Sequence, residues 1–420
     1  MNGSTRQLQV WLNQDRVGLL GMERGQLFFA YSPQWLASST RRPLSVSLPL
    51  QSAPFDHHQT RAYFAGLLPE GGLRKALSRQ LQVSEANDFA LLDALAGECA
   101  GAVSLLPIDA SPPVDASPDV LWLDDAGLAA EMAQLPVRPL GLSHDGVRIS
   151  LAGVQDNLAV VVDGRRIGLP RHGTPSTHIL KPAIAGFADT VLNEAFCLQL
   201  ASRAGLQASA AELRSIDDKP VLLVERYDRL WINGSVRRAH QEDFCQALGI
   251  APELKYQNEG GPGLAQCFEL VRNVTRLPAR HLEQLLQYVI FNTLIGNNDA
   301  HGKNFSLVAD VTGARGLAPL YDAMSLAIYD GLAQKMAMKI GSRYVFEDLH
   351  RRHWEALATE AGFSAKLTLK VLSRLCQDLP VQAAGLAAEA PWSGNATIER
   401  IVQLIQQRAA MTLRRLSLGS

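Results

Sequence analysis

Hydrophobic and polar residues alternate along the first part of the chain in three short runs. The runs cover residues 8–12, 16–20 and 26–31, and polar turn residues separate them at 13–15 and 23–25. A period of two places every second side chain on one buried face, which is typical of β-strands. The pattern becomes helical between residues 60 and 104. We therefore expect a small α/β module, with an antiparallel sheet or barrel, over residues 1–105.

A change in composition separates this module from the rest of the chain. Residues 106–119 contain four prolines, two serines and three aspartates, which is typical of an exposed linker or loop. A short helix is predicted at 126–134, and Pro136 and Pro139 close it. We expect the linker and this helix to occupy residues 106–143.

A second sheet is predicted over residues 144–235. Apolar runs of strand length stand at 149–151, 158–162, 166–169, 177–182 and 221–229. Proline cannot donate to a strand ladder, so we expect Pro182 to stop its strand or to place that strand at an edge. Residues 190–204 carry apolar side chains at helical spacing and end before Gly205, which predicts an amphipathic helix.

Helical periodicity dominates after residue 240. The predicted helices cover 241–248, 263–273, 279–294, 350–361, 364–378 and 397–416, and a strand pair is expected at 305–309 and 316–320. The order of elements predicts an α+β, bilobal architecture. Its N-terminal lobe would be rich in sheet and would include the small α/β module, and its C-terminal lobe, residues 236–420, would be mainly helical.

The composition describes a folded protein without a strong charge. The chain has 420 residues, of which 47% are hydrophobic and 19% charged, and its net charge is −1. Such a chain can bury a large core and is not disordered. A protein that binds DNA by itself usually has a strong basic excess, so any contact with nucleic acid is expected to be local or made through a partner.

The cysteines and the chain's first residues predict a cytoplasmic protein. Five cysteines are scattered in apolar, helical contexts and form no CxxC pair, which favours buried free thiols in a reducing compartment over a zinc site: Cys99, Cys197, Cys245, Cys267 and Cys376. Residues 1–7 lack the apolar core of a signal peptide, and no run of roughly eighteen apolar residues is long enough for a membrane span.

Three polar residues after an apolar helix carry the clearest chemical signal. Asp299 and Asn304 stand five residues apart, and Asp322 follows Asn304 after eighteen more. Protein kinases use this layout: the first aspartate accepts the proton of the substrate hydroxyl, and the asparagine and second aspartate hold magnesium. A polar turn after a helix is the alternative. A calcium loop is excluded, because Val308 stands at its twelfth position in place of glutamate.

A kinase also needs a cation and a cradle for the phosphates of ATP. Lys181 ends a predicted strand and precedes a helix that carries Glu194, which resembles the lysine–glutamate pair of kinases; a solvated lysine at a strand end is the alternative. Residues 150–157 read SLAGVQDN and contain neither GxGxxG nor a Walker A pattern. Such a turn of small residues can still present backbone N–H groups to phosphate, although an ordinary hairpin turn would look the same.

At this point the motifs resemble those of the HipA-type toxin kinases, bacterial serine/threonine protein kinases of type II toxin–antitoxin pairs. The resemblance covers nearly the whole chain. Its strongest element is LIGNNDAHGKNFS at residues 294–306. The other matching segments are residues 41–50, 67–70, 101–103, 150–155, 176–181, 224–229 and 240–243.

The resemblance implies a protein-kinase-like fold, the cofactors ATP and Mg²⁺, and a role for each matching residue. Asp299 would be the catalytic base, Asn304 and Asp322 the magnesium ligands, and Ser150 a site of inhibitory autophosphorylation. The implied ATP-binding residues are Ala152, Gly153, Val154, Gln155, Asp156, Asn157, Lys181, Glu225, Arg226, Tyr227, His301, Gly302, Lys303, Asn304, Tyr321 and Asp322. Of these, residues 152–157 would form the phosphate loop and residues 225–227 the hinge around adenine.

The resemblance also implies substrates and partners. The family phosphorylates aminoacyl-tRNA synthetases, glutamyl-tRNA synthetase above all, which halts translation and growth. A small helix-turn-helix antitoxin would be the partner and would make most of the contact with operator DNA. One departure stands out: Asn157 replaces the lysine that the family commonly has in its phosphate loop. A binding module that represses transcription with the antitoxin, and a small-molecule kinase of similar layout, are therefore the alternative functions.

Overall fold

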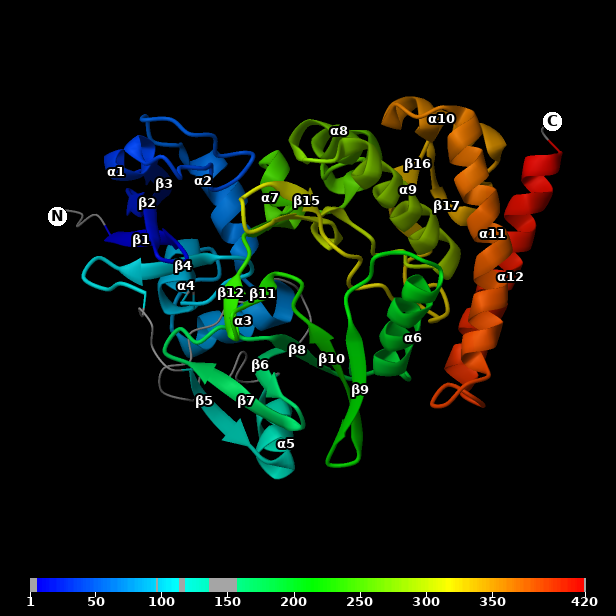
Figure 1. Ribbon diagram of the computed structural model, residues 1–420, viewed down its shortest axis with the longest axis horizontal. Helices are drawn as coiled ribbons and strands as arrows, with labels where there is room; N and C mark the ends of the chain where they lie inside the picture. Colours follow the sequence, from blue (N-terminus) through cyan, green and yellow to red (C-terminus); the bar gives the residue numbers. More distant parts are fainter. Residues whose placement is uncertain (1–5, 96, 113–117, 136–156, 419–420) are drawn as a thin grey trace. The chain divides into compact units, whose positions relative to one another are not determined.

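The computed structural model describes residues 6–95, 97–112, 118–135 and 157–418. The chain divides into two units, which are described one at a time. Unit 1 holds residues up to Pro182, Arg214–Glu253 and Val308–Ala314, and unit 2 holds Ala183–Leu213, Leu254–Leu307 and Arg315–Ser420. Figure 1 shows the elements in chain order.

Unit 1 begins with an antiparallel sheet of four strands in the order β3-β2-β1-β4. The strands are β1 (Arg6–Leu12), β2 (Asp15–Glu23), β3 (Gln26–Tyr31) and β4 (Val103–Pro107). The helices beside it are α1 (Pro33–Ala37), α2 (His57–Phe64), η1 (Ala65–Leu67), α3 (Gly71–Gln80) and α4 (Asp88–Leu95). The period of two therefore predicted the first three strands correctly.

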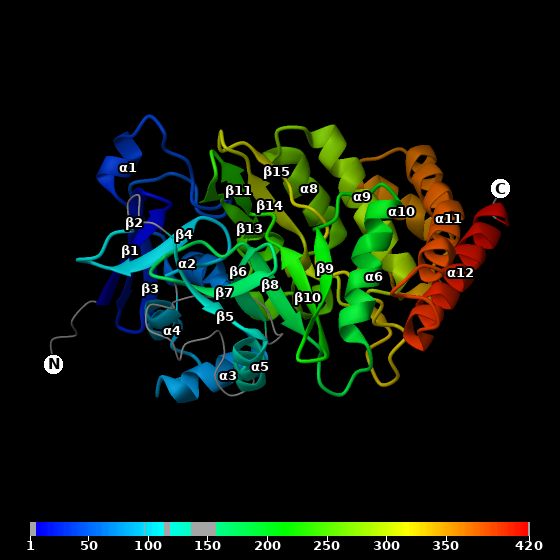
Figure 2. The same ribbon diagram turned by 60° about the horizontal axis from the view of Figure 1, so that its bottom comes forward.

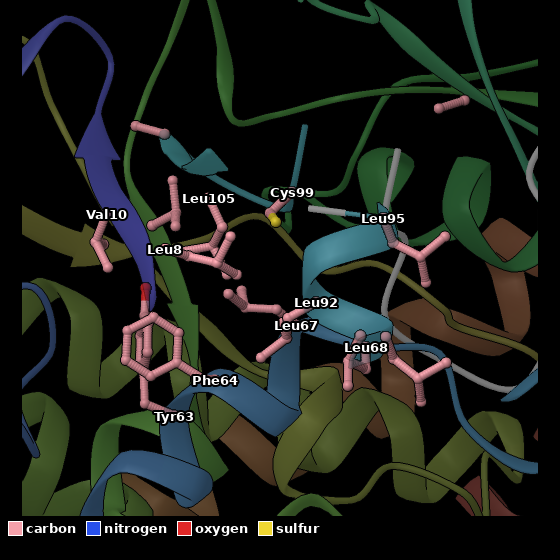
Figure 3. Close-up of a cluster of buried hydrophobic side chains, with 14 of the residues drawn as sticks. Leu8, Val10, Tyr63, Phe64, Leu67, Leu68, Leu92, Leu95, Cys99 and Leu105 are labelled. Atoms are coloured by element: carbon pink, nitrogen blue, oxygen red, sulfur yellow. The ribbon is translucent and has the colours of Figure 1, made fainter. Parts of the chain in front are cut away.

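The core of this first module lies between the sheet and the helices. Leu8 and Val10 on β1 face Phe64, Leu67 and neighbouring side chains, as Figure 3 shows. These side chains are almost completely removed from water, and burial at about 25 cal/mol per Å² of apolar surface is the main force that holds such a module together.

A second sheet of six strands also lies mainly in unit 1, in the order β5-β7-β6-β8-β10-β9. Its strands are β5 (Asp119–Leu123), β6 (Leu158–Asp163), β7 (Arg166–Arg171), β8 (His178–Pro182), β9 (Ala211–Ile216) and β10 (Lys219–Glu225), and α5 (Asp125–Gln134) follows β5. Pro182 ends β8 as predicted. The alternative that it marks an edge is wrong, because β8 pairs with both β6 and β10. A proline at the last position of a strand removes only one terminal hydrogen bond.

Two elements after this sheet differ from their predictions. The strand predicted at 221–229 ends at Glu225, because Arg226 turns inward to a buried aspartate; β11 (Arg229–Ile232) then pairs with β12 (Ser235–Arg238). The helix predicted at 241–248 begins later: β13 (Gln241–Asp243) comes first, and α7 (Phe244–Leu248) starts where Asp243 and Gln246 form a capping box.

Unit 2 is mainly helical, as predicted, and Figure 2 shows its helices from a second side. Its elements are α6 (Thr190–Arg203), η3 (Pro252–Leu254, which begins in unit 1), η4 (Gln257–Glu259), α8 (Leu264–Val274), α9 (Pro278–Ile295), η5 (Gly302–Asn304), β14 (Ser306–Ala309), β15 (Arg315–Leu317), β16 (Lys335–Ile340), β17 (Arg343–Val345), η6 (Phe346–Asp348), α10 (Arg351–Ala361), α11 (Ala365–Ala387) and α12 (Ala396–Ser417). The paired helices α11 and α12 pack against α9.

Helix α9 is the buried axis of unit 2. Most of its last three turns are inaccessible to solvent, from Leu285 to Ile295. Helix α11 continues beyond the predicted end at 378 and carries Pro380 inside it, because Leu379, Ala383 and Leu386 keep one face buried. The hairpin β16–β17 was not predicted. No helix among the described residues is both long and apolar enough to cross a bilayer.

Candidate active site

The polar segment with the kinase-like spacing begins at the C-terminal end of α9. Gly296 caps the helix with φ at 77°, a left-handed conformation that glycine adopts without steric cost. A Cβ at this position would also lie 2.7 Å from the Cβ of Ala327. The side-chain amide of Asn297 then donates to Asn292 Oδ1 at 3.0 Å and to the backbone oxygen of Asp322 at 3.2 Å. The helix end is thereby tied to the second predicted metal ligand.

The predicted catalytic base, Asp299, is half-exposed. Its side chain keeps 47% of its accessible surface. Tyr256 donates a hydrogen bond of 2.5 Å from its hydroxyl to Asp299 Oδ1, and His301 Nε2 lies 3.9 Å from Oδ2. The carboxylate therefore faces solvent with one oxygen held by a phenol and with the other oxygen near an imidazole.

The two predicted magnesium ligands lie next to each other. Asn304 Nδ2 donates to Asp322 Oδ2 at 3.5 Å, while Asn304 Oδ1 is buried and has no hydrogen-bond partner. Asp322 adopts φ at 49°, a conformation that aspartate tolerates better than most residues. Magnesium prefers oxygen ligands and is commonly held by one or two side chains together with phosphate oxygens. The carboxylate and the unpaired amide oxygen fit such an ion.

Several hydrogen bonds fix the segment that carries Asp322. Tyr321 donates from its hydroxyl to the backbone oxygen of Lys303 at 2.8 Å. Asn193 on α6 binds Ser325 in both directions, donating to its oxygen at 3.0 Å and accepting from its N–H at 2.8 Å. The segment that carries Asp322 is therefore held by the η5 turn on one side and by α6 on the other.

The other predicted site residues of unit 2 lie buried in the η5 turn or directly before it. His301, Gly302 and Lys303 are buried, and the N–H of Gly302 donates to the oxygen of Lys255 at 3.3 Å. The structure thus brings Asp299, His301 and Tyr256 into one cluster and Asn304, Tyr321 and Asp322 into another.

Lys181 is buried in unit 1, so the alternative of a solvated lysine at a strand end is wrong. Only 5% of its surface is exposed. It is the next-to-last residue of strand β8, directly before Pro182, and it pairs with Leu222 of β10. The attraction between an ammonium group and an anion is stronger at a buried site than in water, because the dielectric constant there is lower. Glu194 is also buried, on α6 of unit 2.

The predicted hinge, residues 225–227, is attached to a buried ionic network in unit 1. Arg226 donates to both carboxylate oxygens of Asp228, at 3.0 and 2.9 Å, and to Ser176 Oγ at 2.9 Å. Arg229 lies 2.6 Å from Glu98 Oε1. The Arg226 side chain is therefore committed to the network, its backbone N–H donates to Thr177 O at 3.0 Å, and the Tyr227 hydroxyl donates to Gln241 Oε1 at 2.8 Å.

Charge pairing sets the protonation states of the network. Burial alone raises the pKa of Asp228, but Arg226 and Arg229 outweigh it and hold the pKa well below its usual range. The same competition between burial and the two guanidinium groups lowers the pKa of Glu98. All four groups are therefore charged at neutral pH.

The predicted phosphate loop can be located only in part, and one residue beside Asp299 was not predicted. Ser150 and residues 152–156, the predicted phosphate loop and its autophosphorylation site, lie outside the described residues. Asn157 is described: its Oδ1 atom is buried without a hydrogen-bond partner. The sequence did not predict the contact of Tyr256 with Asp299, because the two residues are 43 positions apart. The nearby Gly260 and Gly261 are typical of a turn, but no local pattern links that turn to Asp299.

Comparison with known proteins places this geometry in a family. The HipA-like C-terminal domain model matches residues 149–383, and the HipA N-terminal domain model matches residues 8–106. This chain belongs to the HipA-like family. The C-terminal match contains Lys181, residues 225–227 and the whole segment from Asp299 to Asp322.

Individual HipA-like relatives agree over most of their length. A putative kinase, Y4mE, from Sinorhizobium fredii is 45% identical over 89% of this chain and 90% of its own length. The serine/threonine-protein kinase toxin HipA of Shewanella oneidensis is 28% identical over 90% of this chain and 88% of its own. The solved complex of Shewanella oneidensis HipA with HipB and operator DNA has a chain that matches with a TM-score of 0.85 and 25% identity, over 98% of both chains. The HipA-like, kinase-related fold is thus established for this chain.

Proposed function

We propose that this chain is the toxin of a toxin–antitoxin pair and a serine/threonine protein kinase that uses ATP and Mg²⁺. The observation that carries the proposal is the pairing of a half-exposed Asp299 with the Asn304–Asp322 cluster, whose buried amide oxygen has no hydrogen-bond partner. A base and oxygen ligands for a metal ion are among the few parts that phosphoryl transfer requires of a protein.

The side chains divide the work as follows. Asp299 accepts the proton of a substrate serine through its solvent-facing carboxylate, which raises the nucleophilicity of the hydroxyl oxygen. Asn304 and Asp322 hold magnesium, which when bound neutralises charge on the phosphates of ATP. Lys181 contacts the phosphates, and residues 152–157 form the loop over them. The hinge contributes backbone and the side chains of residues 225 and 227, and residues 301–303 and Tyr321 support the nucleotide site.

We further propose the finer features that membership of the family suggests. The substrate is an aminoacyl-tRNA synthetase, glutamyl-tRNA synthetase first, so that phosphorylation halts translation and growth in the cytoplasm. Autophosphorylation of Ser150 switches the kinase off. A small helix-turn-helix antitoxin is the partner and makes most of the contact with operator DNA, which agrees with a net charge of −1 and with the complex that the Shewanella oneidensis protein forms. We also propose that the chain has its domain boundaries after residues 105, 143 and 235.

Replacement of the base tests the reaction directly. We expect Asp299→Gln to lower phosphate transfer from ATP to glutamyl-tRNA synthetase by at least about 100-fold, because a positioned general base contributes roughly 10²–10⁴ in rate. Radiolabelled phosphate on the acceptor and on Ser150 measures this. Asp330→Asn is a matched control, because Asp330 is an exposed aspartate of the same unit. Equal transfer by Asp299→Gln and the wild type would remove the assignment.

A binding module without catalysis is the second candidate, and Asn157 favours it. The loss of a lysine contact with phosphate costs about 1.5–3 kcal/mol, enough to weaken nucleotide binding. Calorimetry with ATP and Mg²⁺ separates the two candidates: binding supports the kinase, and its absence together with retained antitoxin binding supports the module. Phosphate on Ser150 of the expressed protein would also exclude a kinase restricted to small molecules.

A further inference from the structure

The first turn of α10 and the last turn of α12 enclose a hollow in unit 2, which we call the α10–α12 hollow. Its volume is about 600 Å³. Figure 1 shows the C-terminal end of α12, drawn in red, beside α10. Four arginines line the hollow: Arg351, Arg352, Arg414 and Arg415. None of the proposed active-site residues lies among its lining side chains, so the kinase function leaves this cluster of cations unexplained.

Hydrogen bonds fix two of the four arginines. Arg415 Nη1 donates to the backbone oxygen of Leu349 at 2.7 Å, which ties the last turn of α12 to the residue before the N-cap of α10. Arg351 Nε donates to Glu355 Oε1 at 2.8 Å, one turn further along α10. Trp354 anchors α10 itself, because its ring is buried on the opposite face. The walls of the hollow are therefore held by the protein.

The other two arginines, Arg352 and Arg414, are exposed and have no acidic partner among the described residues. Glu355 is the one acid that lines the hollow, and Arg351 binds it. Burial lowers the pKa of the neighbouring His353, and Arg352 lowers it further. Four positive charges against one negative charge leave the hollow cationic, and a concave surface concentrates such a field.

The chemistry of the lining selects phosphate as the group that would bind. A guanidinium presents a planar fork of N–H donors that matches two oxygens of one phosphate. Leu418 is the one apolar side chain recorded in the lining, so the hollow has little surface for a nucleic-acid base or an apolar side chain. Several guanidinium groups in one hollow suit an anion that carries several phosphates.

The surroundings favour a compact anion over a DNA duplex. A duplex is normally bound by a broad basic surface that follows its phosphates. Glu347 and Asp348, directly before α10, are exposed acids, and the net charge of the chain is −1. A small anion that enters the hollow can contact the arginines without covering those two carboxylates.

We propose that the α10–α12 hollow binds a compact anion with several adjacent phosphate groups, held by Arg352 and Arg414 between the fixed side chains of Arg351 and Arg415. Inorganic polyphosphate is the simplest anion of this class. Such a ligand joins the first turn of α10 to the last turn of α12, so its binding stabilises unit 2 against unfolding. The proposal does not depend on the kinase function.

The first test is calorimetry of the full chain with tripolyphosphate and with orthophosphate at low ionic strength. We expect the double variant Arg352→Gln, Arg414→Gln to bind tripolyphosphate roughly 10- to 100-fold more weakly than the wild type, the equivalent of losing a hydrogen bond to a charged group. The double variant Arg280→Gln, Arg374→Gln removes two exposed arginines elsewhere in unit 2 and should bind like the wild type. Orthophosphate should bind more weakly than tripolyphosphate, because a single phosphate engages fewer guanidinium groups.

Three results would overturn the proposal. Equal affinity of the two double variants for tripolyphosphate would place its binding elsewhere, for example at the site proposed for ATP. Equal affinity of the wild type for orthophosphate and tripolyphosphate would remove the requirement for adjacent phosphates. A short DNA duplex that binds through Arg352 and Arg414 more tightly than tripolyphosphate would make nucleic acid the ligand.

The second test locates the ligand on the wild type and needs no variant to fold. Phenylglyoxal modifies accessible arginines, and mass spectrometry measures the rate at each position. We expect tripolyphosphate to slow modification of Arg352 and Arg414 and to leave Arg280 and Arg374 unchanged. Equal rates with and without tripolyphosphate at all four positions would reject the site. Because neither test uses ATP or a protein substrate, a chain without kinase activity would leave this result intact.

Discussion

Two aspartates of this protein have opposite surroundings. Asp228 of unit 1 is buried, and both of its oxygens are used: Arg226 binds each of them, and Arg229 and the N–H of Gly101 add contacts to Oδ2. Asp299 of unit 2 is half-exposed, and the hydroxyl of Tyr256 donates to its Oδ1.

The difference lies in what each carboxylate has left over. The Asp228 network contains two acids and two guanidinium groups, so its charge is balanced inside the protein. The cluster around Asn304 retains an oxygen with no hydrogen-bond partner, and Asp322 is exposed. A buried oxygen without a hydrogen-bond partner occurs in both places, Glu98 Oε2 in the network and Asn304 Oδ1 in the cluster. The first belongs to a carboxylate that two guanidinium groups neutralise, whereas the second lies beside the exposed carboxylate of Asp322 and can bind a ligand. Density of charged residues alone would not have separated the two.

The largest expected effect comes from removing a proposed metal ligand. We expect Asp322→Asn to lower phosphate transfer by about a thousandfold, since metal coordination contributes several kcal/mol of transition-state stabilisation and 1.4 kcal/mol is tenfold in rate. The Tm should stay within about 2 °C, because the side chain is exposed. Transfer assays over a Mg²⁺ series, with thermal melts, measure both. A large fall in Tm would show that Asp322 belongs with the structural aspartate and not with the catalytic one.

Removing a paired charge should have the reverse outcome. We expect Arg226→Met to destabilise unit 1 by about 3–5 kcal/mol, because it leaves Asp228 buried without its main partner. Urea unfolding measures this, and Arg165→Met, an exposed arginine of the same unit, should change little. If Arg226→Met unfolds like the wild type but loses ATP binding, the network is part of the nucleotide site and the contrast disappears.

The smallest effect concerns pH. The folded-state pKa of both Asp228 and Glu98 is lowered, so the stability they contribute is complete above their unfolded pKa of about 4 and is lost as pH falls through the folded values. We expect unfolding free energy to fall below about pH 4 more steeply in the wild type than in an Asp228→Asn, Glu98→Gln double variant. Urea titrations at pH 3, 4 and 6 measure the slopes. Parallel slopes would mean that other carboxylates dominate acid unfolding.

The sequence predicted the parts of the molecule that leave a local pattern. Alternation located β1 to β3, and helical spacing located α6, α8, α9, α10 and α12 within a residue or two. The spacing of Asp299, Asn304 and Asp322 brought the two metal-ligand candidates together in the structure, because a turn and one hairpin fix how far apart such residues can lie.

Features built from distant residues could not be predicted in this way. Glu98 meets Arg229 across 131 positions, and Tyr256 meets Asp299 across 43. Such pairs depend on how whole elements pack, which no single window of sequence contains. The same holds for Pro380, which ends helices by local rules but lies inside α11, where burial of Leu379 and Ala383 on the helix face outweighs the lost backbone bond.

Gly296 has a mechanical consequence. Its carbonyl oxygen accepts from the N–H groups of both Leu326 and Ala327 at 3.0 Å, while Asn297 binds the backbone oxygen of Asp322. The end of α9 and the segment from Asp322 to Ala327 are therefore cross-linked at two points, one at Asp322 itself and one four to five residues after it. A fluctuation that opened the loop of Asp299 would have to break both links together, so the spacing of base and ligands is preserved during smaller thermal motions.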